Sequence, residues 1–177
     1  QPKMKTFILF TLFLPTFCYS YTISGIDLRN GKKATIQTED ERPLVAFFLS
    51  SNCPCSQASF NYLNSIQKKY PTYQFVGINS NKTTKNSSAM KYYQKFDITF
   101  PVILDKKLIY ANEFGALKTP HVFIKLNDKI VFQGGATNRR NPLKSTKFYL
   151  NDALDNLKNN IPIKITKSKT LGCYIRR

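Results

Sequence analysis

The sequence lacks tryptophan, internal repeats, low-complexity segments and any run of basic residues longer than two lysines. Its 27 Lys and Arg residues outnumber the 10 acidic ones, and a net charge of +17 would suit an anionic partner such as nucleic acid or a lipid surface. The lysines are scattered, however, and no basic helix or aromatic–basic signature accompanies them. We therefore attribute the charge to biased residue usage and solubility, expect no nucleic-acid partner, and rank a basic nucleic-acid-binding domain third among the hypotheses below.

The chain also lacks an apolar run long enough to cross a bilayer. The run over residues 7–18 follows a basic start and is too short to span the membrane core. This arrangement is typical of a secretory signal peptide over residues 1–20, with a mature chain beginning near Tyr21. The alternatives are an uncleaved membrane anchor and lipid attachment at Cys18, the second of which is disfavoured by the bulky Phe17. We expect an exported protein, periplasmic or extracellular, in which disulfides can persist.

Cysteine is scarce. Once residues 1–20 are removed, Cys53, Cys55 and Cys173 remain. An odd number in an exported protein implies a free thiol, a metal ligand or a pairing that changes with redox state. A purely structural set of disulfides would more often use an even number.

A buried strand that ends at two cysteines is the most informative stretch. The continuous apolar run Leu44–Leu49 is rich in Val and Phe and is bounded by turn formers, which predicts a fully buried strand. Cys53 and Cys55 follow it, and a helical pattern then extends to Lys69. Unpaired N–H groups and the dipole at a helix N-terminus stabilise a thiolate over a thiol. The stretch therefore predicts a reactive-thiol site.

The rest of the chain alternates between strand and helix patterns. The order we predict is a hairpin within residues 21–40, strand 44–49, helix 55–69, strand 73–78, helix 84–96, a short element at 100–105 leading to a brief helix at 110–114, strands 118–125 and 130–135, and helix 145–159. The β-α-β start favours a right-handed crossover with parallel strands, and the later hairpin adds antiparallel ones. This order predicts an α/β fold with a mixed sheet and helices on both faces.

With 177 residues, of which 42% are hydrophobic, the chain can build the core of one domain of about 150 residues. We assign residues 21–165 to that domain and residues 166–177 to a C-terminal tail that carries Cys173.

The motifs around the cysteines carry a family resemblance. A strand ending in Cys53-Pro54-Cys55, a helix, and Lys118-Thr119-Pro120 before a hairpin resemble the thioredoxin-like superfamily. Within it, the chain is most similar to the exported redoxins near the alkyl hydroperoxide reductase/thiol-specific antioxidant proteins, on the segments 75–81, 100–105, 119–124 and 172–175. The resemblance implies a three-layer fold with a mixed central sheet.

The resemblance also implies roles for individual residues. It makes Cys53 the nucleophile and Pro120 a cis-proline packed beside it, so that Thr119 and His121 would flank the thiol. The usual two-residue spacing would put a second thiol at position 56, where this chain has Ser56. Two partners therefore stay open: Cys55, through a strained and easily reduced Cys-x-Cys ring, and Cys173, if the tail folds back over the site.

A peroxidase site is only half present. Ser50 occupies the hydroxyl position of a peroxidatic loop and Pro54 follows the cysteine, but Ala46 stands where the loop proline belongs. The arginine that would polarise the peroxide has two candidates, Arg139 and Arg140; such donors matter because a leaving oxyanion must be stabilised.

Two functions follow. The first is a thiol–disulfide oxidoreductase or, in a variant of the same hypothesis, a thiol peroxidase that reduces peroxides. Its substrates would be protein thiols and disulfides, or peroxides. It would take electrons from a thiol donor and use no cofactor. The second is a copper-delivery module in which Cys53, Cys55 and His121 bind Cu(I), since thiolate and imidazole suit that soft ion.

Overall fold

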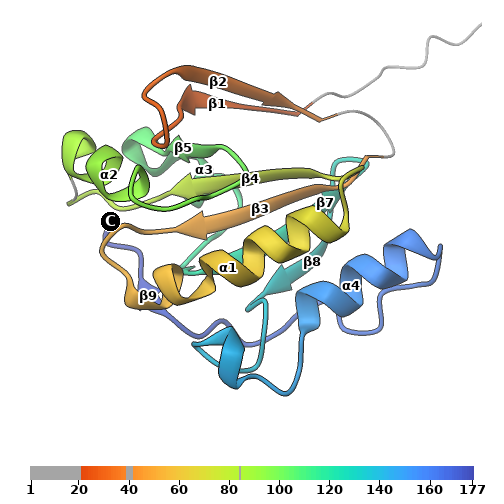
Figure 1. The fold of residues 1–177 in the computed structure, drawn as a ribbon. Coiled ribbons are helices and arrows are strands. Elements are labelled where there is room, and N and C mark those ends of the chain that lie inside the picture. Colours follow the sequence, from red (N-terminus) through yellow and green to blue (C-terminus); the bar gives the residue numbers. More distant parts are fainter. Residues whose placement is uncertain (1–20, 39–41, 84) are drawn as a thin grey trace, which may run out of the picture.

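A five-stranded mixed sheet forms the centre of the protein, as the computed structural model shows for residues 21–38, 42–83 and 85–177 (Figure 1). Its strands, in spatial order, are β5 (Val102–Leu104), β4 (Gln74–Asn79), β3 (Leu44–Leu49), β7 (His121–Leu126) and β8 (Lys129–Gly134). Strand β3 pairs in parallel with β4, and β4 with β5, whereas β7 is antiparallel to both β3 and β8. The mixed sheet predicted from the sequence is confirmed.

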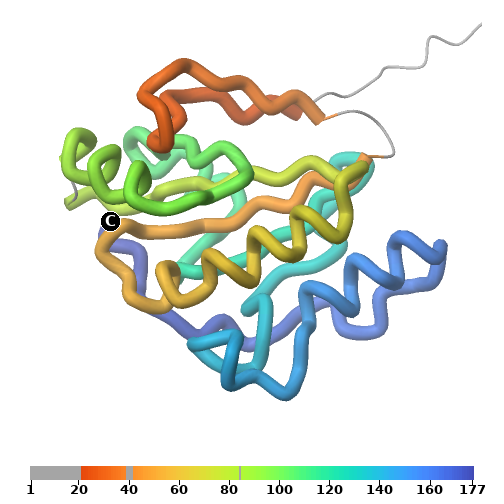
Figure 2. The backbone as a smooth tube through the Cα atoms, in the orientation of Figure 1, coloured from red at the N-terminus to blue at the C-terminus, as the bar shows by residue number. Residues whose placement is uncertain are grey.

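Helices cover both faces of this sheet, which gives three layers (Figures 1 and 2). The helices are α1 (Pro54–Lys69), α2 (Asn86–Tyr93), α3 (Ile109–Glu113) and α4 (Tyr149–Lys158), with single 3-10 turns at Lys106–Leu108 and Pro142–Lys144. Alternate residues of β3 point to opposite faces. Val45 and Phe47 pack in the cluster with α1, α2 and α4, while Ala46 and Phe48 pack in the cluster with α3.

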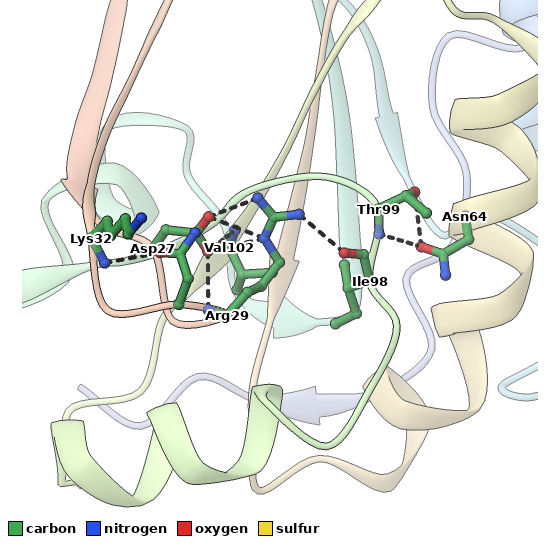
Figure 3. A network of polar contacts seen from close by, with 8 residues as sticks. Asp27, Arg29, Lys32, Asn64, Ile98, Thr99 and Val102 are labelled. Atoms are coloured by element: carbon green, nitrogen blue, oxygen red, sulfur yellow. Dashed lines mark hydrogen bonds and ion pairs between the residues drawn. The ribbon is translucent and has the colours of Figure 1, made fainter.

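The N-terminal hairpin, β1 (Thr22–Ile26) and β2 (Lys33–Gln37), is held at the edge of the sheet by the half-buried Asp27–Arg29 ion pair and its hydrogen bonds (Figure 3). The Asp27 carboxylate accepts hydrogen bonds from the Arg29 backbone and guanidinium and from Val102 N at 3.1 Å, and Arg29 Nη1 donates to Ile98 O. Burial raises the pKa of Asp27, but the bonds from Arg29 outweigh it and hold that pKa below its usual range. An ionised carboxylate therefore ties the hairpin to β5.

Several predicted elements have different boundaries, among them the helix predicted over residues 84–96, which is α2 (Asn86–Tyr93). Two of the differences have a clear structural cause. The last helix begins at Tyr149 rather than residue 145, because Asn138 Oδ1 accepts from Thr146 N and Lys147 N and so holds that segment against a loop. The strand predicted over residues 118–125 is interrupted by a cis Thr119–Pro120 bond, which separates β6 (Lys118–Thr119) from β7.

The tail folds back onto the domain. Its short strand β9 (Cys173–Tyr174), labelled in Figure 1, pairs antiparallel with β6, and Cys173 lies opposite Thr119. Ile175 is buried in the cluster around α3, and its N–H donates to Leu117 O at 3.0 Å. The tail thereby becomes part of the structure around the cis-proline.

The predicted signal peptide and Cys18 lie outside the described residues. Among the residues that the structure does describe, no helix has both the length and the apolar character needed to cross a membrane.

Candidate functional site

Cys53 lies at the junction that the sequence predicted. It is the residue directly before α1, Pro54 occupies the first turn of that helix, and the side chain is 2% exposed. Its backbone N–H donates to Ser50 O at 3.1 Å, and Sγ donates to Thr119 O at 3.0 Å. The thiol therefore sits between the helix N-terminus and the cis-proline segment.

Strand β9 delivers the tail cysteine to the same place. Pairing with β6 sets Cys173 opposite Thr119, whose carbonyl already accepts from Cys53. At Gly172, just before Cys173, the tail backbone lies very close to the backbone of β6: a Cβ added to Gly172 would lie 2.0 Å from Thr119 O. Glycine at position 172 is thus what allows the tail to reach the site.

Three free thiols meet here. The sulfur atoms of Cys53, Cys55 and Cys173 all lie within 4.8 Å of one another; Cys53 is buried and the other two are half-buried. No other group of three metal-ligating side chains is found in the described part of the chain. The arrangement can support disulfide exchange among the thiols or coordination of an ion by them.

The three thiols differ in acidity. Burial raises the pKa of Cys53, but hydrogen bonds from Cys173 and from the Ser56 backbone outweigh it and lower the pKa from 9.0 to about 7. The pKa of Cys55 is raised by burial and by the Cys53 charge. The hydrogen bond to Cys53, followed by burial, raises the pKa of Cys173 to about 12. At neutral pH the thiolate is therefore centred on Cys53, which becomes the strongest nucleophile.

This difference predicts a pH profile. The rate at which iodoacetamide alkylates Cys53 should be half-maximal near pH 7, because the thiolate is the reactive form. In Cys173→Ala the side-chain donor is lost, and the midpoint should rise toward 9.0. Cys173→Ser keeps a hydrogen-bond donor, so its alkylation midpoint should lie closer to that of the wild type. Mass spectrometry of the alkylated peptides measures each midpoint, and an unshifted Cys173→Ala profile would contradict the assignment.

Thr119 and Pro120 lie at the thiols, whereas the His121 side chain lies elsewhere. The His121 ring packs at a tilt against Phe123, with centroids 4.3 Å apart, and lines a cavity of about 340 Å³ together with Lys118 and Lys167. Burial, followed by repulsion from those two lysines, lowers the pKa of His121 to about 4. Its imidazole is not in the cluster of ligand atoms.

Polar side chains fix the loop before Cys53. Ser56, at the position of the usual second thiol, is fully buried and its Oγ accepts from Ser50 N at 3.2 Å. The Ser50 hydroxyl accepts from Asn52 N and from Asn81 Nδ2, both at 3.2 Å. Sequence reasoning missed Asn79, whose Oδ1 accepts from Ser51 N at 3.1 Å. The signal available in the sequence was that Asn79, a polar residue, ends the buried strand that neighbours the strand before Cys53.

Arg139 and Arg140 line an open hollow of about 630 Å³ with Leu171, two residues before Cys173. The charge of Arg140 lowers the pKa of Cys55, although the net shift of that thiol is upward. Arg140 is thus the arginine whose charge reaches the thiol cluster, on the side of Cys55.

A mixed sheet with helices on both faces, a cysteine directly before the first long helix and a cis-proline beside it define the thioredoxin-like fold. The fold that the resemblance implied is confirmed by structural similarity. No known protein-family profile matches the sequence, and no curated protein sequence matches it.

Solved structures with this fold cover most of the chain. An uncharacterised conserved protein from Geobacillus kaustophilus is 21% identical, with a TM-score of 0.77 over 89% of each chain. Etrx1, an exposed lipoprotein thioredoxin from Streptococcus pneumoniae, is 16% identical, with a TM-score of 0.60 over 78% of this chain and 99% of that one. A putative thiol:disulfide interchange protein DsbE from Chlorobium tepidum is 20% identical, with a TM-score of 0.57 over 79% of this chain and 92% of that one.

Proposed function

We propose that this protein is an exported thiol–disulfide oxidoreductase in which Cys53 is the nucleophile and Cys173 is the resolving thiol. The observation that carries the proposal is the β6–β9 pairing, which sets Cys173 opposite Thr119 and its sulfur within 4.8 Å of Cys53. The low pKa of Cys53, about 7, makes it both a good attacking thiolate and a good leaving group.

The exchange has two steps. The Cys53 thiolate attacks one sulfur of a substrate disulfide, so that a mixed disulfide forms and the other substrate sulfur leaves as a thiolate. The Cys173 thiolate then attacks Cys53 Sγ and releases the second substrate thiolate. The substrate disulfide is reduced by two electrons, the protein gains a Cys53–Cys173 disulfide, and an external dithiol donor must reduce that bond to restore the enzyme.

The high pKa of Cys173 belongs to the reduced state. Its largest cause is the hydrogen bond to Cys53, with burial and the Cys53 charge adding to it. In the mixed disulfide Cys53 no longer carries a charge, so the contributions of its charge and hydrogen bond disappear, burial remains, and the pKa of Cys173 falls toward the ordinary thiol range. The resolving thiol is thereby activated only after the first step.

Cys55 is the less suitable resolving thiol. A Cys53–Cys55 disulfide would close a very small strained ring, and burial together with the Cys53 charge raises the pKa of Cys55. Disulfide exchange is also favoured over peroxide reduction, because Ala46, inside the fully buried strand β3, stands where the peroxidatic loop proline belongs.

Protein disulfides are the substrates we propose. The descriptions of the similar structures support this choice, since one is a putative thiol:disulfide interchange protein and another a secreted disulfide oxidoreductase of Mycobacterium tuberculosis. The description of the mycobacterial protein as secreted, together with that of the exposed pneumococcal lipoprotein, supports export.

Trapping the mixed disulfide tests the proposal. Reduced Cys173→Ser protein mixed with a peptide disulfide should accumulate a covalent peptide adduct on Cys53, because serine cannot attack a disulfide. Wild-type protein should instead release the peptide and form the Cys53–Cys173 bond. Mass spectrometry follows both species with time. Resolution by Cys173→Ser at the wild-type rate would assign the second step to Cys55 and contradict the proposal.

A further inference from the structure

The thiol cluster has a composition that disulfide exchange does not require. Exchange needs two sulfurs, yet three free thiols converge, two from the start of α1 and one from β9. No carboxylate or imidazole belongs to the group of ligand atoms. The third sulfur, that of Cys55, is therefore the feature to be explained.

The spacing of the sulfurs suits a single small ion. At a metal–sulfur distance of about 2.3 Å, three sulfurs around one ion in a plane lie about 4.0 Å apart. The sulfurs of Cys53, Cys55 and Cys173 already lie within 4.8 Å of one another. Small side-chain rotations are enough to close the difference, since Cys55 and Cys173 are only half-buried.

The donor set selects the kind of ion. Thiolates alone favour soft ions such as Cu(I) and Zn²⁺, whereas Mg²⁺, Ca²⁺ and Mn²⁺ prefer oxygen ligands. Three sulfurs without a fourth protein ligand leave a tetrahedral Zn²⁺ site incomplete, whereas Cu(I) accepts three ligands. Arg140, whose charge acts on Cys55, offsets the excess negative charge that three thiolates would place around a monovalent ion.

We propose that Cys53, Cys55 and Cys173 form a three-thiolate Cu(I) site that β9 completes. This site goes beyond the proposed disulfide exchange and differs from a Cys53–Cys55–His121 site, because His121 lines a cavity with Lys118 and Lys167. The ion and the disulfide require the same sulfurs. Bound Cu(I) therefore blocks exchange, and a Cys53–Cys173 disulfide prevents Cu(I) binding.

Titration of the fully reduced wild-type chain with Cu(I), without oxygen and in competition with bathocuproine disulfonate, tests the site. One ion should bind per chain with a dissociation constant far below micromolar. Cys173→Ser should weaken binding by at least about 100-fold, more than the loss of an outer-shell partner typically costs. His121→Ala is the matched control and should bind as wild type does.

X-ray absorption is measured on the wild-type complex, so misfolding of a variant cannot affect the result. It should show three sulfur neighbours and no imidazole nitrogen. Micromolar or weaker binding, wild-type affinity in Cys173→Ser, or an imidazole ligand would each overturn the site. None of these results depends on the disulfide trap above, so failure of the metal site and failure of the exchange proposal are distinguishable.

Discussion

Replacing Cys53 with serine should abolish thiol–disulfide exchange, lowering the turnover of a peptide disulfide by about 10³-fold or more, as removal of a catalytic nucleophile does. Cys53 is the thiol whose pKa is lowered, to about 7, while the pKa values of Cys55 and Cys173 are raised. In Cys53→Ser the contributions of the Cys53 charge and hydrogen bonds are lost, and the pKa values of Cys55 and Cys173 return toward the ordinary thiol range. Ordinary thiols are mostly protonated at neutral pH, so neither should replace Cys53 efficiently in the first attack. Release of the peptide thiol, followed with a fluorescent peptide disulfide and dithiothreitol as donor, measures the loss.

The matched control for this substitution is Ser65→Ala, a change at an exposed position of α1. It should leave turnover within experimental scatter of wild type. Turnover of Cys53→Ser comparable with that of the control would show that another thiol starts the reaction, and it would remove the basis for placing the nucleophile before α1.

The second large effect is expected at Gly172, which is not a reacting residue. In Gly172→Ala the new Cβ would lie 2.0 Å from Thr119 O and 2.7 Å from Thr119 C, both backbone atoms that cannot rotate away. Overpacking of this kind costs about 1–3 kcal/mol, which would shift the docking of β9 roughly 10- to 100-fold toward the detached state. We expect the equilibrium constant for forming the Cys53–Cys173 disulfide to fall by the same factor and the alkylation midpoint of Cys53 to rise.

Tyr174→Phe is the control for Gly172→Ala, because Tyr174 belongs to the same strand, is 73% exposed and keeps a ring for the contact with Lys118. Both variants are treated with the same concentration of oxidant, and the fraction of Cys53–Cys173 disulfide in each is measured by mass spectrometry of the cysteine-containing peptides. If Gly172→Ala forms the disulfide as readily as the control, the tail does not need β9 to reach Cys53.

The fold was predictable because its signals are local and strong. The fully apolar run Leu44–Leu49 could only be a central strand, and it is buried along its whole length. The helix that follows shows apolar positions one turn apart, and Phe60, Leu63 and Ile66 are all buried on one side of α1. A strand, a helix and a second strand then favour the parallel β3–β4 pair.

The tail was not predictable as a strand, although its cysteine was singled out. Strand β9 is two residues long, too short for any alternation, and its partner β6 lies more than 50 residues earlier. What identifies it is backbone pairing, which leaves no pattern in the sequence. Gly172 was the one local signal, since a glycine before a cysteine permits a close approach of two chains.

His121 shows the limit of reasoning from adjacency. It follows Pro120 in sequence and was expected to flank Cys53. Side chains two residues apart on a strand share a face, and His121 shares its face with Phe123, which packs in the cluster around α3. The structure therefore brings Thr119 to the thiol through its carbonyl and places the imidazole in a different cavity.

A map of the disulfide in oxidised wild-type protein tests the central claim most directly. Reduced protein is oxidised with one equivalent of a peptide disulfide, remaining thiols are alkylated, and the cross-linked peptides are identified by mass spectrometry. Cys53 joined to Cys173, with Cys55 alkylated, is the predicted result. Cys53 joined to Cys55, with Cys173 alkylated, would contradict the role assigned to β9.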